Sequence, residues 1–265
     1  FNAIFRLTGE GCRRLACLDS ASRQEVDVSA VALKSWMKRG ETPAARAALS
    51  VAKALRRPQL PVIRPLHRAL YELHLGVAGL LGWALQTLWY TPLLQSRLTR
   101  TAPRLRLENG APQIAGALDA TLGADCSVNG AASWTGRTAG GRRPALRVGD
   151  RATLGWRNVI SVGTAIEIGD DVLLSSDVHL AGYPGHPLDP AARAAGAPDE
   201  DAQCGDIVIE TGAWLGAGVF VNAGVRIGRG TVVAARSVVT RDLPSGVLAA
   251  GAPARPIRSL DGSTP

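Results

Sequence analysis

Apolar residues recur every six positions through the C-terminal half of the chain, and this period constrains the fold more than any other feature. From residue 209 the chain reads IETGAW LGAGVF VNAGVR IGRGTV VAARSV VTRDLP. The same spacing occurs upstream in triplets, so that the repeat positions are Leu122, Val128, Trp134, Val148, Leu154, Ile160, Ile168, Leu174, Leu180, Ile209, Leu215, Val221, Ile227, Val233 and Val239. Helices need a period of 3.6, so this pattern predicts short strands.

Three consecutive hexads predict one turn of a triangular coil. Stacked turns lie at the strand spacing of roughly 4.8 Å, so the repeat positions form three inward columns of branched side chains. Trp134 is the one aromatic member of these columns and is large for so narrow an interior. We therefore expect a mainly β fold, a parallel β-helix of about five triangular coils, preceded by an α-helical N-terminal region.

Each interruption of the period follows a third hexad. The steps across the three interruptions are 14, 8 and 29 residues, and they begin at Trp134, Ile160 and Leu180. All three insertions therefore leave the coil at the same corner. Together they form one ridge along that edge of the coil. The longest contains GYPGHPLDPAAR, which holds His186 and projects from an otherwise flat face to make a pocket.

Four segments carry a resemblance to a known family. They are IEIGDDVLLSSDVHLAG, GHPLDPAAR, the hexads from residue 207 to RDLP, and the closing GAPARPIR. On these segments the chain resembles the bacterial hexapeptide-repeat acyltransferases, closest to the maltose, galactoside and polysaccharide O-acetyltransferases. The resemblance covers roughly residues 118–260. It implies a left-handed coil, acetyl-CoA as acyl donor, and a homotrimer that binds the donor between neighbouring subunits.

The resemblance also implies the catalytic base, which is His186 of the GHP motif. Imidazole is suited to accept a proton from a hydroxyl near neutral pH. The acceptor oxygen then attacks the thioester directly, without an acyl-enzyme intermediate. His179 faces outward beside Leu180 and is a second candidate participant. Asp189 either orients the imidazole or caps the turn that follows it, and the cap is the favoured interpretation.

By the same resemblance, a groove along the coils holds acetyl-CoA. Its expected residues are Trp214, Ala217, Ala235, Thr240 and Arg241, with Arg255 and Arg258 near the nucleotide phosphates. Arginine forks suit phosphate oxygens. Arg236 departs from the glycine-containing run usual in the family, so it either contacts phosphate or crowds the groove. Asn158 lies out of register with the family's acceptor-binding asparagine, and we do not assign it that role.

No metal is expected in the repeat region. A carbonic-anhydrase-like zinc site needs three histidines, whereas this region holds His179 and His186 alone. The four cysteines of the chain lack paired spacing, so neither a zinc site nor a disulfide framework is indicated, and a reducing cytosol fits; they are Cys12, Cys17, Cys126 and Cys204.

Positive charge is concentrated in the first part of the chain. Residues 1–106 hold 17 Lys and Arg against 6 Asp and Glu, whereas residues 107–265 hold 13 against 16. No nucleic-acid-binding motif accompanies this charge, so nucleic acid is not an expected partner. An anionic membrane surface, contacted through residues 61–106, is the better candidate. The expected location is cytoplasmic, or peripheral at the inner face of the cytoplasmic membrane.

The segment Leu73–Ser96 holds 24 residues without an acidic or basic side chain. That length is enough for a bilayer span, but three glycines weaken it, and its Trp and Tyr residues are of the kind favoured at interfaces. Three alternatives stay open: a helix on or dipping into the membrane, a helix packed on the coil or a neighbouring subunit, and a true span. In the first, headgroups would meet Arg97, Arg100, Arg104 and Arg106.

These observations predict four parts of the chain. They are a poorly defined basic region (1–60), a helical and membrane-surface segment (61–106), the hexapeptide-repeat acyltransferase domain (107–260) and a tail (261–265). Within the first part, Thr42–Arg57 is expected to be a basic helix that begins at a Thr-Pro boundary. No charged-then-apolar signal pattern opens the chain.

The predicted function is acetyl-CoA-dependent O-acetylation of a sugar hydroxyl in a polysaccharide or lipid-linked glycan. An amino-sugar N-acetyltransferase is the alternative enzyme. A non-catalytic assembly scaffold built on the same coil is the alternative from another class.

Overall fold

The computed structural model describes residues 31–56 and 61–260, so the predicted tail and two of the four cysteines, Cys12 and Cys17, lie outside the described residues. The chain divides into two compact units after Glu72. In the first unit, residues 31–39 are helical and α2 spans Pro43–Arg56. Thr42 caps α2, because its Oγ1 accepts a hydrogen bond from the backbone N–H of Ala45 at 3.1 Å. The helix predicted from the Thr-Pro boundary is confirmed.

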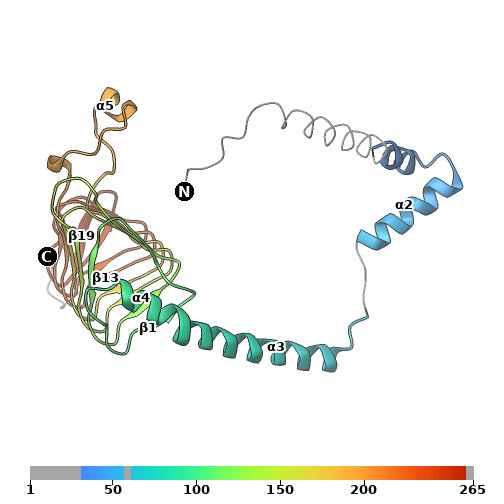
Figure 1. The fold of residues 1–265 in the computed structure, drawn as a ribbon, viewed down its shortest axis with the longest axis horizontal. Coiled ribbons are helices and arrows are strands. Elements are labelled where there is room, and N and C mark those ends of the chain that lie inside the picture. Colours follow the sequence, from blue (N-terminus) through green and yellow to red (C-terminus); the bar gives the residue numbers. More distant parts are fainter. Residues whose placement is uncertain (1–30, 57–60, 261–265) are drawn as a thin grey trace, which may run out of the picture. The chain divides into compact units, whose positions relative to one another are not determined.

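The second unit is a parallel β-helix whose strands form three sheets (Figure 1). Sheet A contains β1 (Arg106–Glu108), β4 (Ser127–Asn129), β7 (Thr153–Leu154), β10 (Leu173–Leu174), β13 (Trp214–Leu215), β16 (Val232–Val233), β18 (Val247–Gly251) and β19 (Ala254–Ser259). Sheet B contains β2 (Gln113–Ala115), β5 (Ser133–Gly136), β8 (Val159–Val162), β11 (His179–Ala181), β14 (Phe220–Asn222) and β17 (Val238–Val239). Sheet C contains β3 (Asp119–Leu122), β6 (Ala145–Val148), β9 (Ala165–Ile168), β12 (Ile207–Ile209) and β15 (Arg226–Ile227).

The strand register confirms the three predicted columns. In sheet A, Leu154 pairs with Leu174, and Leu174 pairs with Leu215. All fifteen repeat positions are buried. Trp134 pairs with Ile160 in sheet B and its side chain is 0% exposed, so the interior accommodates the indole. The hydrophobic core is therefore the inside of the coil.

The coil begins earlier than the hexads indicate. Leu107 pairs with Val128 and Ile114 pairs with Trp134, which adds a first turn below the predicted ones. The sequence hides this turn because the steps from Leu107 to Ile114 and on to Leu122 are seven and eight residues rather than six.

Different structures close the two ends of the coil. Below the first turn, π-helix η1 (Gln86–Tyr90) and α4 (Thr91–Arg97) continue α3 (Arg64–Leu85), and Leu94, Leu98 and Ala102 are buried in the core cluster. At the other end, β19 pairs with β18 in the antiparallel sense and interrupts the parallel stacking. Such caps cover the apolar interior that a solenoid would otherwise expose.

The corners are tight because small residues let successive turns approach. A Cβ added at Gly169 would lie 2.6 Å from the backbone nitrogen of Thr211 on the next turn, so only glycine fits there. Two positions along the chain, Asp171 adopts a φ of 56° and Arg151 takes the same φ one turn below it. The two side chains form an ion pair with 2.7 Å between Arg151 Nε and Asp171 Oδ1.

All three predicted insertions connect sheet B to sheet C, as the ridge hypothesis requires. They join β5 to β6, β8 to β9 and β11 to β12. The longest insertion contains α5 (Pro190–Ala194) and the 3-10 helix η2 (Asp201–Gln203), and it stands away from the coil in Figure 1. The ridge therefore carries the loop that holds His186.

Candidate functional site

His186 lies in the loop between β11 and β12, and its side chain is exposed. Around it, Arg193 donates hydrogen bonds from Nη1 to the carbonyl oxygens of Pro187 and Leu188, both at 2.9 Å. These contacts fix the backbone just after the histidine. Within the part of the chain that the structure describes, no hydrogen bond or ion pair is found at the His186 ring, so the imidazole is free to meet a ligand.

A buried ion pair holds the base of this loop to the coil. Arg137 follows β5, and Asp199 lies in the returning half of the loop, yet both side chains are 5% exposed. Arg137 donates from Nε to Asp199 Oδ1 at 2.8 Å, from Nη2 to the Asp199 carbonyl at 2.7 Å, and from Nη1 to Asp201 at 2.5 Å. These hydrogen bonds to carboxylates raise the pKa of Arg137 above its usual value.

The same pair reaches the residue before His186. The backbone N–H of Gly185 donates to the second carboxylate oxygen of Asp199 at 3.3 Å. Tyr183 adds a further tie, since its hydroxyl donates to Thr135 on β5 at 3.2 Å. We call Arg137, Asp199 and Tyr183 the loop clamp. Sequence reasoning missed these residues, although Arg137 and Asp199 both lie in insertions assigned to the same ridge.

Asp189 caps a helix. Its Oδ2 accepts a hydrogen bond from the backbone N–H of Ala192 at 2.7 Å, at the start of α5. The favoured interpretation of Asp189 is therefore confirmed, and its carboxylate is directed to the backbone rather than to an imidazole.

His179 lies on the outer face of sheet B and is half-buried. Its ring makes an edge contact with Phe220, with 4.6 Å between ring centroids. Burial lowers the pKa of His179 below its ordinary value, because the charged imidazolium loses solvation. No hydrogen bond joins the His179 and His186 rings among the contacts of the described residues, so the structure does not bring the two candidates together as a pair.

Three of the expected donor-binding residues lie together on sheet A and at the corner where it turns into sheet B. Trp214 is on β13 with its ring half-exposed, and its Nε1 donates to Ser175 at 3.0 Å. Ala217 and Ala235 stack at this corner on successive turns, where the carbonyl of Ala217 accepts from the N–H of Arg236. Small side chains beside an exposed indole leave room for an extended ligand.

Arg236 occupies a left-handed position at this corner, with a φ of 58°. One turn below it is Gly218, and a Cβ built there would lie 3.4 Å from Arg236 Cγ. The aliphatic part of the Arg236 side chain therefore lies over Gly218, and Arg236 is exposed at this corner.

The remaining expected donor residues lie elsewhere on the coil. Thr240 and Arg241 follow β17 at the corner between sheets B and C, and both are exposed. Arg255 and Arg258 are exposed on β19 at the end of sheet A. The eight predicted site residues are thus distributed over separate edges of one chain, and His186 does not share a corner with Trp214.

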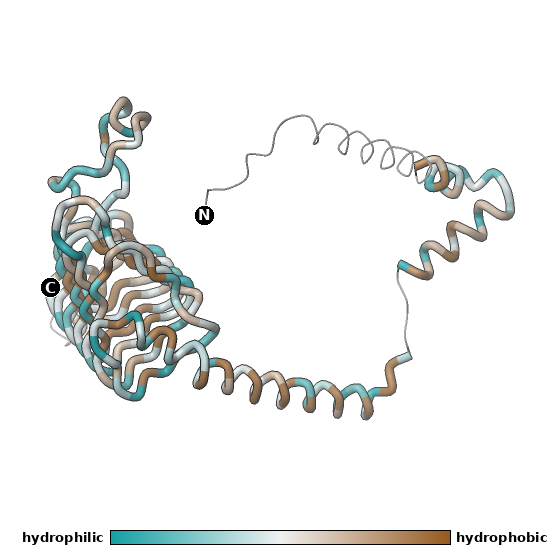
Figure 2. The backbone as a smooth tube through the Cα atoms, viewed as in Figure 1, coloured by the Kyte–Doolittle hydropathy of each residue, from teal (hydrophilic) through white to brown (hydrophobic). Residues whose placement is uncertain are grey.

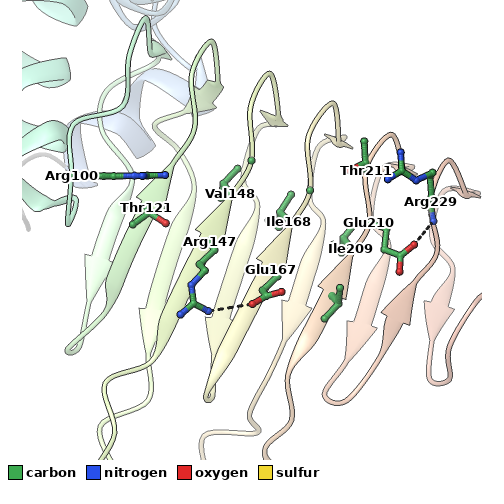
Figure 3. A pocket seen from close by; sticks show the side chains of 13 residues that line it. Arg100, Thr121, Arg147, Val148, Glu167, Ile168, Ile209, Glu210, Thr211 and Arg229 are labelled. Atoms are coloured by element: carbon green, nitrogen blue, oxygen red, sulfur yellow. Dashed lines mark hydrogen bonds and ion pairs between the residues drawn. The ribbon is translucent and has the colours of Figure 1, made fainter.

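A hollow of about 540 Å³ lies on the outer face of sheet C and contains none of the predicted site residues (Figure 3). Three of its charged side chains, Arg147, Glu167 and Glu210, already have charged partners. Arg147 pairs with Glu167 at 3.2 Å, and Glu210 accepts from the side chain of Arg226 at 2.6 Å and from the backbone N–H of Arg229 at 2.9 Å. We assign no chemistry to it.

Known proteins are similar to part of this chain. A putative acetyltransferase of Schizosaccharomyces pombe is 43% identical over 97 residues, which cover 36% of this chain and 44% of the relative. The galactoside O-acetyltransferase of Escherichia coli is 38% identical over 96 residues, which cover 36% of this chain and 45% of the relative. The chain thus spans less than half the length of these two curated relatives. No family model matches it.

Among solved structures, a hexapeptide-repeat acetyltransferase from Vibrio cholerae is 26% identical, with a TM-score of 0.45, and the match covers 71% of this chain and 92% of that one. Because this TM-score is below 0.5, the fold rests on the strand register described above. The six-residue period, the GHP loop and the curated relatives agree with one another. Over part of its length the chain is similar to acetyltransferases, among them two named galactoside O-acetyltransferases.

Proposed function

We propose that the chain is an acetyl-CoA-dependent O-acetyltransferase that acts on a sugar hydroxyl, with His186 as general base. The observation that carries the proposal is the exposed imidazole on a loop that the coil holds through a buried ion pair. A general base must be both free to reach its proton and held in place, and the GHP loop meets both conditions.

The chemistry needs one proton acceptor. An imidazole nitrogen of His186 takes the proton of the acceptor hydroxyl as that oxygen attacks the carbonyl carbon of the thioester. The carbon–sulfur bond then breaks, and the proton passes to the departing thiolate, so that the products are the acetyl ester and free CoA. Developing charge on the carbonyl oxygen needs a hydrogen-bond donor, and backbone N–H groups commonly serve this role.

The donor site is assigned to the expected groove. The exposed ring of Trp214 and the small side chains of Ala217 and Ala235 suit a long, thin pantetheine arm. Thr240 and Arg241 are proposed to line the same groove, while Arg255 and Arg258 supply cations for the nucleotide phosphates.

A homotrimer is proposed because the catalytic base and the donor groove lie at different corners of one chain. His186 emerges between sheets B and C, whereas Ala217 lies at the corner between sheets A and B. A donor bound at the second corner therefore meets the histidine of a neighbouring copy. The outer faces favour this arrangement: sheets A and B present Trp214 and Phe220, whereas sheet C presents paired charges.

The acceptor class is proposed from the relatives. Two of them, from Escherichia coli and Lactococcus lactis, are named galactoside O-acetyltransferases, which favours a sugar hydroxyl in a glycan or polysaccharide. An N-acetyltransferase is the second candidate, because a 57-residue stretch is 49% identical to a tetrahydropyridine-dicarboxylate N-acetyltransferase of Clostridium perfringens.

Substitution of His186 tests the proposal. We expect His186→Ala to lower turnover by roughly 10² to 10⁴, the range typical of a lost general base, and to leave CoA affinity in calorimetry unchanged. His74→Ala, an exposed histidine of α3, is the matched control and should keep full turnover. Loss of CoA binding in His186→Ala would contradict the assigned role.

Paired sugars that offer either an amine or a hydroxyl distinguish the two enzyme candidates. Acetyl ester formation supports O-transfer, and acetamide formation supports the alternative. A chain that binds no CoA would favour an assembly scaffold over both enzymes.

A further inference from the structure

Helix α3 exposes an unusual amount of apolar surface. None of its residues is buried, and from Leu73 onward its side chains are mostly apolar (Figure 2). Among the large exposures in this stretch and in η1 are 63% for Trp83, 64% for Leu80 and 72% for Leu88. A contiguous apolar surface of this kind on a folded protein marks a place where something else binds.

The helix is attached firmly to the coil. Gln86 accepts a hydrogen bond from the backbone N–H of Gly110 at 3.1 Å, and Gln95 exchanges two hydrogen bonds with the backbone of Ala102, both at 2.7 Å. Leu94 fills the core beneath the first turn. Whatever covers the segment Leu73–Leu93 therefore also fixes the orientation of the coil.

Apolar side chains surround the helix on all sides. At 100° per residue, Leu73, Val77 and Leu80 form one stripe, which a second helix could cover. Leu75 lies on the opposite side of the helix and Trp83 lies about 60° beyond Leu80, and the two residues are 47% and 63% exposed. A helix that is apolar all round suits lipid better than a single protein partner.

The positive charges that flank the apolar stretch indicate which kind of lipid it would bind. The uncharged stretch is followed directly by Arg97 and Arg100, both exposed, and α3 begins with Arg64 and Arg68. No ion pair engages any of the four in the described part of the chain. Arg104 and Arg106, by contrast, form surface ion pairs with Asp125 and Glu108.

We propose that the segment Leu73–Leu93 docks on an anionic lipid bilayer and lies within its interface. Trp83 and Trp89 suit the headgroup level, and the flanking arginines suit acidic headgroups. Within residues 31–56 and 61–260, no helix has the length and apolarity needed to cross a bilayer. The inference does not depend on the proposed acetyl transfer, because lipid binding requires neither His186 nor a donor.

Vesicle flotation of the full chain tests this proposal. Phosphatidylcholine vesicles with phosphatidylglycerol should bind the chain, and pure phosphatidylcholine vesicles should bind it far less. Arg97→Gln with Arg100→Gln should weaken binding to the anionic vesicles by about 30-fold at low ionic strength, since each basic residue near such a surface contributes about fivefold. Leu80→Glu with Trp83→Glu should abolish binding to both.

Leu188→Glu, an exposed leucine of the loop between β11 and β12, is the matched control and should bind as the unaltered chain does. Circular dichroism and solution mass, measured for every variant, show that each is folded. Two results would overturn the proposal: an unaltered chain that does not bind anionic vesicles, or helix variants that keep their vesicle binding but lose their oligomeric state. The second would assign the helix surface to a further copy of the chain.

Discussion

Removing the Arg137 guanidinium should release the loop that carries His186. In Arg137→Met, the carboxylate of Asp199 would keep its buried place without the cation that now lies 2.8 Å from it. Leaving one partner of a buried pair uncompensated costs about 3–5 kcal/mol. The chain can avoid this cost by opening the loop and hydrating Asp199, so the equilibrium population of the open form should rise by up to roughly 10² to 10⁴.

Turnover should fall in Arg137→Met because the loop would no longer position His186. A displacement of about 1 Å in a catalytic group can lower a rate by 10². We therefore expect Arg137→Met to lower kcat strongly while CoA affinity changes little, because Trp214, Ala217 and Ala235 lie at another corner of the coil. Hydrogen exchange should rise over residues 183–205 and stay slow in the coil strands.

Two further variants make the result specific. Arg142→Met removes an exposed arginine from the same insertion and should change neither exchange nor turnover. Arg137→Met combined with Asp199→Leu removes both charges and should loosen the loop less than the single change does. Slow loop exchange and full kcat in Arg137→Met would refute the clamp.

Three other changes test separate parts of the account. Leu174→Ala should destabilise the coil by about 2–5 kcal/mol in urea unfolding, whereas the exposed neighbour Leu173→Ala should cost little; equal effects would contradict the inward column. His179 has a lowered pKa, so the unfolded chain binds its proton more readily, and stability should fall as the pH drops below 6.5. Replacing His179 by Phe should make the stability depend less on pH, measured as the urea midpoint from pH 7 to pH 5. An unchanged slope of midpoint against pH would show that His179 does not cause the dependence. Asp189→Asn should keep the cap of α5 and full turnover. A large loss of turnover would instead indicate that the Asp189 carboxylate takes part in catalysis.

The strict period made most of the coil predictable from sequence. Every turn repeats one geometry, so an apolar residue at each sixth position fixes strand, register and burial together, as at Leu154 and Leu174. Trp134 fits the same register although its size argued against the interior. The first turn was missed because its spacing is irregular, and Leu107 and Ile114 are recognisable only once Val128 and Trp134 are placed.

The six-residue period does not predict the loop clamp. Arg137 and Asp199 are 62 residues apart and lie outside the hexads, so nothing in the repeat pairs them. The ridge geometry was the available signal, because insertions that leave one corner on nearby turns become neighbours in space. Choosing Asp199 over the adjacent acidic residues required the backbone path of the loop.

The central claim is that His186 of one copy acts on a donor held at another corner of a neighbouring copy. Assemblies mixed from His186→Ala and Trp214→Ala chains test it most directly, with turnover measured after subunit exchange is verified by mass. Each variant alone should be slow. If the site is shared, random mixing at equal amounts restores about a quarter of the interfaces, and turnover should recover to that extent. Verified mixed assemblies that stay as slow as their parents would contradict the shared site.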